Sequence, residues 1–254
     1  MDAYALPFRD AVAAYQAEST PTAALFRAIM AHPAWLVAGE HGPDGLRLAV
    51  LNPNGRGRIL ELFSDDAAVA AFEATAEGPV QSGRVTLAGH ALFSGLAEGA
   101  VDKIRFDPLS HHGISYVADR LPLLVAWARI VRVELALYAP ASLPDPLGAL
   151  AHHDDYKVVV VQDAGDDELV LAPDASGRAL AAVFTAEDTA AAFVKAMAED
   201  TGERFEVRSR AGGPLFGRLD GMGLDGLVFN PLSHLPARAL GAAVLPRLTA
   251  RRAP

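Results

Sequence analysis

Residues 106–111 read FDPLSH, and residues 229–234 read FNPLSH. Five of these six positions are identical, and the two hexapeptides are separated by 123 residues. Earlier residues match at the same separation: Leu92 with Leu215, Phe93 with Phe216, and Asp102 with Asp225. A series of matches at one separation indicates an internal repeat.

A second block of matches extends the repeat towards the N-terminus. Residues 48–72 align with residues 169–193 at a separation of 121, without a gap. The matched pairs include Leu48 with Leu169, Phe63 with Phe184, and Phe72 with Phe193. The separation changes by two residues between Phe72 and Leu92, which indicates a small insertion or deletion there. The chain therefore consists of two copies of one unit of roughly 100 residues.

Both copies predict the same succession of elements, because residues typical of turns separate short apolar runs. The strands expected in the first copy are Trp35–Gly39, Leu46–Leu51, Arg58–Phe63, Arg84–Leu87 and Lys103–Phe106. Those expected in the second copy are Lys157–Val161, Glu168–Leu171, Ala179–Phe184, Arg204–Arg208 and Gly226–Phe229. Ser64 and Thr185 are each expected to be the N-cap of the helix that follows the third strand. The predicted fold class is α+β, with two tandem similar units, each a mixed β-sheet (a three-stranded meander plus further strands) packed with helices.

The repeat also predicts how the chain is divided. We expect an N-terminal helical arm over residues 1–20, one unit over 21–138, a proline-rich linker over 139–146 and a second unit over 147–254. Helices are expected over 117–128 and over about 237–248. Residues 132–138 alternate between apolar and polar side chains, which predicts a strand.

Composition excludes several classes of protein. The chain of 254 residues has no cysteine, so it can form neither disulfides nor zinc–thiolate sites. Its formal charge of −9 argues against a general nucleic-acid-binding protein. The apolar stretch 121–138 contains Arg129, Arg132 and Glu134, so we expect no membrane span. Residues 1–9 lack the pattern of a secretory signal, and we expect a cytoplasmic protein.

The strand–helix junctions and the ends of the units resemble those of a known family. The junctions read FSDDA at residues 63–67 and FTAED at 184–188, and the second copy ends in LDGLVFNP at 224–231. This pattern is similar to the SseB family of bacteria, the enhanced serine sensitivity proteins. The first copy departs from it, with Lys103 at the position of Gly226 and Asp107 at that of Asn230. The resemblance implies a bacterial, cytosolic α/β module, often in tandem, without a well-defined catalytic centre.

The repeated hexapeptide supplies the candidate site residues. Asp107, Ser110 and His111 place a carboxylate, a hydroxyl and an imidazole after a strand, where open α/β sheets often bind ligands. The second copy has Asn230, Ser233 and His234 at these positions. One interpretation is a turn held by Asp107 or Asn230 whose serine caps the next helix, and another is a binding surface. Catalysis is the weakest interpretation, because adjacent serine and histidine side chains rarely converge and no Gly-x-Ser-x-Gly motif is present.

Other motifs predict no cofactor or metal site. Residues 221–226 match Gly-x-Gly-x-x-Gly, but they precede a strand, whereas a dinucleotide-binding motif follows one and opens a helix. The doublets His111-His112 and His152-His153 could suggest a metal, but neighbouring side chains on a regular element point apart. We therefore expect no cofactor and no metal.

Two functions from different classes fit these observations. The first is a non-enzymatic binding or adaptor protein that engages a protein partner through its repeated hexapeptides. The alternative is a small-molecule sensor or enzyme whose site is lined by Asp107, Ser110 and His111. A homodimer is compatible with either function.

Overall fold

The computed structural model describes residues 5–43, 45–55, 57–75, 83–96, 100–162, 169–173 and 176–251. Its contacts divide the chain into unit 1, Met1–Val131, and unit 2, Arg132–Pro254. The point of division lies within the helix α5 (Leu121–Tyr138). The expected limits of the units remain a prediction, because this division follows contacts and not the sequence repeat.

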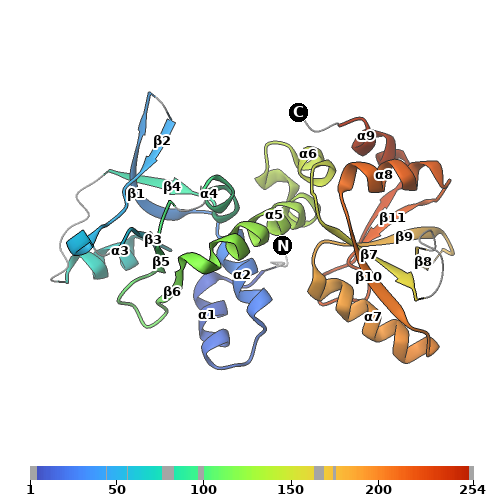
Figure 1. Ribbon diagram of the computed structural model, residues 1–254, viewed down its shortest axis with the longest axis horizontal. Coiled ribbons are helices and arrows are strands. Elements are labelled where there is room, and N and C mark those ends of the chain that lie inside the picture. Colours follow the sequence, from blue (N-terminus) through green and yellow to red (C-terminus); the bar gives the residue numbers. More distant parts are fainter. Residues whose placement is uncertain are drawn as a thin grey trace. The chain divides into compact units, whose positions relative to one another are not determined.

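Unit 1 is a mixed sheet with helices packed on it (Figure 1). Its helices are α1 (Phe8–Gln16), α2 (Thr22–Ala31), α3 (Asp66–Glu73), α4 (Gly89–Gly95) and the first part of α5, with short 3₁₀ turns at Pro53–Gly55 and Ala118–Arg120. Its strands are β1 (Trp35–Gly42), β2 (Gly45–Leu48), β3 (Ile59–Phe63), β4 (Arg84–Leu87), β5 (Lys103–Phe106) and β6 (Ile114–Val117). The strand order is β2-β1-β3-β5-β6, and β4 also pairs with β1.

Unit 2 repeats this architecture. Its helices are the remainder of α5, α6 (Pro146–Ala151), α7 (Glu187–Thr201), α8 (Gly212–Gly221) and α9 (Leu245–Thr249), with 3₁₀ turns at Pro140–Ser142 and Ala242–Val244. Its strands are β7 (Tyr156–Val161), β8 (Leu171–Pro173), β9 (Ala179–Phe184), β10 (Phe205–Arg210), β11 (Gly226–Phe229) and β12 (Arg238–Gly241). The strand order is β10-β7-β9-β11-β12, and β8 also pairs with β9.

The predicted fold class is confirmed, since both units are α+β with mixed sheets of similar topology. One pair in each sheet is parallel, β3 with β5 and β9 with β11, and the other strand pairs are antiparallel. The first and third strands of each unit also pair directly, β1 with β3 and β7 with β9. Part of the second-copy strand expected at 168–171 lies outside the described residues.

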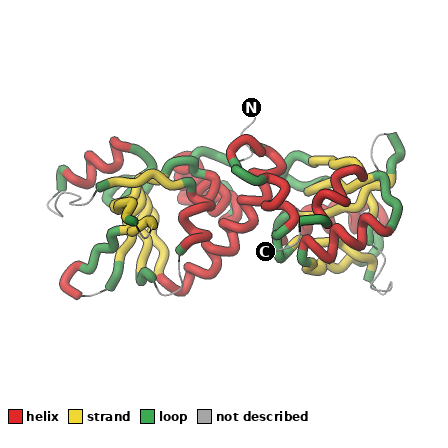
Figure 2. The backbone as a smooth tube through the Cα atoms, turned by 90° about the horizontal axis from the view of Figure 1, so that it is seen from above, coloured by secondary structure: helices red, strands yellow, loops and turns green. Residues whose placement is uncertain are grey.

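Aromatic side chains at equivalent positions form the core on one face of each sheet, against the helices that Figure 2 shows beside the strands. In unit 1 the ring centroid of Trp35 lies 5.2 Å from that of Phe106, and Phe93 lies 6.0 Å from Phe106. In unit 2 Tyr156 takes the place of the tryptophan, 5.3 Å from Phe216 and 5.8 Å from Phe229. All six residues are almost completely buried in their own unit.

The strand predicted over Arg132–Tyr138 is wrong, because this segment continues α5 as a helix. The apolar residues Val133, Leu135 and Leu137 alternate with Glu134 and Ala136, which suggested a strand. In the structure all five side chains are buried, so the segment is enclosed on every side and its alternation carries no information about a face.

The helices expected directly after the two hexapeptides are also wrong in their first residues. Ile114–Val117 forms β6 and pairs with β5, and Arg238–Gly241 forms β12 and pairs with β11. Each new strand satisfies backbone groups along the otherwise open edge of its neighbour. Each hexapeptide is therefore part of a hairpin connection at an edge of the sheet.

Candidate functional site

The hairpin loop of unit 1, residues 107–113, has an unusual backbone. Asp107 has φ 41° and Leu109 has φ 67°, both in the left-handed region. Asparagine and aspartate tolerate that region better than other residues, whereas leucine is disfavoured there. The Leu109 side chain is 57% exposed, so packing within unit 1 does not compensate for the strained backbone of this residue.

The hairpin loop of unit 2, residues 230–237, repeats this backbone. Asn230 has φ 52° and Leu232 has φ 51°. The Leu232 side chain is 63% exposed. Both units therefore hold a leucine in a strained conformation and present it to solvent. We call residues 107–113 and 230–237 the leucine loops.

The Asp107 side chain points into unit 1 and holds the junction between β3 and α3. Its residue is completely buried, and its carboxylate accepts hydrogen bonds from Ser64 N (2.7 Å) and Ser64 Oγ (2.6 Å). Arg9 Nε of α1 lies 3.7 Å from Asp107 Oδ2, and Arg9 Nη2 donates to Asp65 Oδ1 (2.9 Å). These contacts join the loop to the start of α3 and to α1.

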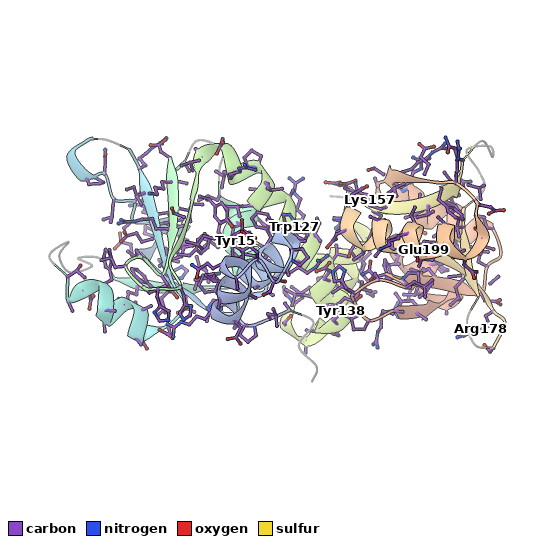
Figure 3. All side chains as sticks on the ribbon, turned by 90° about the horizontal axis from the view of Figure 1, so that it is seen from below. Tyr15, Trp127, Tyr138, Lys157, Arg178 and Glu199 are labelled. Carbon is purple, nitrogen blue, oxygen red and sulfur yellow. The ribbon has the colours of Figure 1, made fainter. Side chains whose placement is uncertain are left out.

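Asn230 makes the equivalent connection in unit 2 with its side-chain amide. Its Oδ1 accepts from Thr185 N (3.0 Å), and its Nδ2 donates to the hydroxyl of Tyr138 (3.0 Å), which Figure 3 labels. The Thr185 hydroxyl donates to Glu134 Oε1 (3.0 Å), and the Tyr138 hydroxyl donates to Pro236 O (2.9 Å). The difference between Asp107 and Asn230 thus follows the different partners that α1 and α5 provide.

Ser64 and Thr185 are not the N-caps of the following helices, contrary to the prediction. The N-cap of α3 is Asp65, whose carboxylate accepts from Ala68 N (2.8 Å). The N-cap position of α7 is Ala186. The hydroxyl residue lies one position before the N-cap in each unit. Its side chain bonds to Asp107 in unit 1, and to Glu134 and Asn230 in unit 2, instead of capping the helix.

The serines of the leucine loops stabilise the loops themselves. Ser110 Oγ accepts from His112 N (3.2 Å). Ser233 Oγ donates to Asn230 O (2.9 Å) and accepts from Leu235 N (3.1 Å). These bonds form a local turn, but the serines cap no helix because a strand follows each loop.

The two histidines lie at the surface and are not aligned for catalysis. His111 is exposed, and its ring centroid lies 3.8 Å from that of His112. His234 Nε2 lies 3.5 Å from Asp188 Oδ2, in the first turn of α7. Among the described residues, neither Ser110 nor His111 bonds to the Asp107 carboxylate. The three residues are neighbours in the chain without forming a nucleophile, base and orienter in series.

A second pair of equivalent residues was missed by the sequence analysis. His32 and His153 follow α2 and α6 at the separation of 121, and their carbonyl oxygens accept from Gly89 N (2.9 Å) and Gly212 N (2.8 Å). Burial lowers the pKa of both histidines below the usual value, against hydrogen bonds and nearby carboxylates that raise it. His32 Nε2 lies 3.2 Å from Ser64 O, which connects it to the same junction as Asp107. The repeat itself could have revealed these residues, since Trp35 and Tyr156 match at the same separation.

Two cavities lie elsewhere. One of about 420 Å³ in unit 2 is lined by Ala151, His152, His153, Asp154, Ala211, Gly212, Gly213, Pro214, Thr249 and Arg251. One of about 270 Å³ in unit 1 is lined by Ala5, Leu6, Pro7, Phe8, Ala28, Ala31, His32 and Pro33. No candidate residue of the leucine loops lines either cavity.

The part of the chain that the structure describes lacks two features: a cluster of metal-ligating side chains and a membrane-spanning helix. It contains no group of three or more His, Asp or Glu side chains that could hold a metal ion. It also contains no helix long and apolar enough to cross a membrane.

Comparisons with known proteins add no assignment. No family model and no curated protein matches the chain. Among solved structures, Tic22 of Anabaena, described as a protein of protein transport, matches with 8% identity and a TM-score of 0.22 over 79% of this chain and 87% of that one. This similarity is too low to carry an argument about fold or function.

Proposed function

We propose that this chain is a non-enzymatic binding protein that engages a protein partner through its two leucine loops. The observation that carries the proposal is the exposed leucine with a left-handed backbone, Leu109 in unit 1 and Leu232 in unit 2. A resemblance to the SseB family is compatible with such a role.

The physical argument rests on two free-energy costs that occur in both loops. A leucine in the left-handed region costs roughly 1–2 kcal/mol relative to the right-handed one. Leaving the exposed part of its side chain in water forgoes about 1–2 kcal/mol of burial. Glycine or asparagine would form the same turn without either cost. Burial of Leu109 and Leu232 in apolar pockets of a partner would recover the second cost.

The alternative function, a sensor or enzyme lined by Asp107, Ser110 and His111, has less support from the geometry. The Asp107 carboxylate is occupied by Ser64, and the Ser110 hydroxyl by the backbone of His112. Neither group is directed into one of the two cavities.

The test is affinity capture from the lysate of the source organism, with partners identified by mass spectrometry. The loop variant is Leu109→Asn/Leu232→Asn, since asparagine accepts the left-handed backbone and removes the apolar side chain. The control variant is Leu46→Asn/Leu171→Asn, which removes one leucine of 39% exposure from each unit. We expect a partner that binds the wild type and the control but not the loop variant. A partner retained by the loop variant would refute the proposal.

A further inference from the structure

Among the described residues, no strand pairs with the outer edge of β10 in unit 2, where backbone groups point outward in a regular series. Among the described strands, β10 pairs with β7 alone, with Phe205 opposite Val161 and Arg210 opposite Tyr156. Gln162 N donates to Arg204 O (2.8 Å), which fixes the phase of the antiparallel ladder. Residues 204, 206, 208 and 210 therefore direct their N–H and C=O groups towards β7. The N–H and C=O groups of Phe205, Val207 and Ser209 point away from it.

The side chains of β10 divide between two faces. Phe205 and Val207 pack against the core cluster beneath α7. Glu206 and Arg208 lie on the opposite face, where Arg208 Nη2 donates to Glu206 Oε2 (2.9 Å). This hydrogen bond lowers the pKa of the Glu206 carboxyl, so both groups are charged near neutral pH.

We propose that β10 pairs with β10 of a second copy of this chain, antiparallel and centred on Val207. In this register Val207 lies opposite Val207 of the other copy, and Phe205 lies opposite Ser209. The three outward residues of each strand then exchange both backbone hydrogen bonds with their opposites. The Ser209 carbonyl, which accepts from Arg210 Nη1 (2.9 Å), has a second lone pair for this bond.

The charges of β10 and its length together favour this register over its neighbours. With Val207 at the centre, Glu206 of each copy lies opposite Arg208 of the other, at the positions where side chains of antiparallel strands approach most closely. A shift of the partner by two residues in one direction places Glu206 opposite Glu206. A shift in the other direction places Arg208 opposite Arg208 and Glu206 opposite Arg210, but it leaves Phe205 opposite Ala211, beyond the end of β10, so fewer backbone hydrogen bonds form. The proposed register brings Arg210 opposite Arg204 only at the ends, where Arg204 lies outside the strand and is exposed.

The equivalent edge of unit 1 lacks this pattern. Gly39 N donates to Gly83 O (2.8 Å), so only Arg84 and Thr86 of the four-residue strand β4 direct backbone groups outward. The self-complementary edge is therefore a property of β10 and not of the repeated architecture.

The proposal is tested by sedimentation velocity over a range of concentrations with the full chain. The wild type is expected to dimerise. Glu206→Arg and Arg208→Glu each place like charges opposite one another twice, and each is expected to weaken dimerisation about tenfold or more. The combined variant Glu206→Arg/Arg208→Glu restores both opposite pairs and is expected to dimerise like the wild type.

Mixing the two single variants provides a second readout. A heterodimer places the arginine introduced by Glu206→Arg opposite the glutamate introduced by Arg208→Glu, and its other pair is the native arginine opposite the native glutamate. Native mass spectrometry of the equimolar mixture should show this heterodimer in excess of either homodimer. Ser209→Pro removes an outward N–H without breaking the ladder with β7, and it should also weaken the dimer.

Several results would overturn the proposal. A wild type that stays monomeric at all concentrations shows that the charges protect the edge from pairing. Single variants that dimerise like the wild type show that another surface is used. A mixture without heterodimer excess refutes the register. Circular dichroism of each variant distinguishes these outcomes from unfolding.

Discussion

Replacing Asp107 tests the junction that anchors the leucine loop of unit 1. Asp107→Ala removes the acceptor of Ser64 N and Ser64 Oγ. A buried donor such as Ser64 N costs about 1–3 kcal/mol when it is left without a partner. The Ser64 hydroxyl is half-buried, so it can recover part of its loss by bonding to water. Arg9 adds little, because it is 39% exposed and keeps its contact with Asp65. The expected loss of unfolding free energy is therefore about 2–4 kcal/mol.

Asp107→Asn separates this explanation from a simple requirement for charge. The amide oxygen can still accept from Ser64 N, as Asn230 accepts from Thr185 N in unit 2. Asparagine also tolerates the left-handed backbone at this position. We therefore expect a loss of about 1 kcal/mol or less.

The chain provides a selective probe for this measurement. Both of its tryptophans, Trp35 and Trp127, lie in unit 1. Tryptophan fluorescence during urea unfolding therefore reports on the unit that contains Asp107. Asp66→Ala, which removes an exposed carboxylate from the first turn of α3, serves as the control and should cost under about 1 kcal/mol. The reasoning is wrong if Asp107→Ala stays close to wild-type stability, or if the asparagine variant is as unstable as the alanine variant.

Four further predictions are tested by unfolding, three with the tryptophan probe of unit 1 and one in unit 2 with circular dichroism. Burial holds the pKa of His32 below its unfolded value of 6.5, so the unfolded chain binds the proton more readily and unit 1 should lose stability as pH falls below about 6.5. His32→Phe should reduce this pH dependence, and an unchanged pH profile of stability would contradict the prediction. Gly89→Ala should destabilise unit 1 strongly, since the new Cβ would lie 2.3 Å from Ile29 O, whereas Gly95→Ala, which meets open space, should be tolerated. In unit 2, Gly212→Ala should lower the unfolding free energy because its Cβ would lie 2.7 Å from Ala151 O, while Gly213→Ala should leave it unchanged or raise it. Unfolding of unit 2 is followed by circular dichroism, and equal effects of the two variants would refute the close-approach argument. Leu109→Asn should stabilise unit 1 by about 1 kcal/mol by relieving the left-handed leucine, and a loss of stability would show that the leucine supports the fold.

The repeat predicted most of the fold because it doubled the evidence for each element. The third strand of each unit and the strand before each hexapeptide were located within about one residue, and the α+β class followed from their order. Local patterns failed where burial was complete, as at residues 133–137, because periodicity identifies an element only when one face is exposed. They also failed at β6 and β12, which form because β5 and β11 offer a free edge. No local window of sequence contains that information.

The candidate site was predicted in part. The hexapeptides were correctly placed after strands, but the prediction that their serines cap a following helix was wrong, since the serines bond within the loops. The roles of Asp107 and Asn230 could not be predicted, because their partners Ser64 and Thr185 lie 43 and 45 residues away. The positive φ of Leu109 and Leu232 was equally hidden, since leucine gives no signal of a left-handed backbone.

The differences between the two units indicate which features the architecture requires. The anchor of the loop uses a carboxylate with Arg9 in unit 1 and an amide with Tyr138 in unit 2, so the connection is retained while its chemistry changes. A left-handed turn position accepts several residue types. The exchange of Asp107 for Asn230, two positions before the leucine, shows that this loop tolerates substitution. The leucine is identical in both units although glycine or asparagine would be better suited to its backbone. The fold accounts for the anchor but not for the choice of leucine, and the proposed contact with a protein partner would explain that choice.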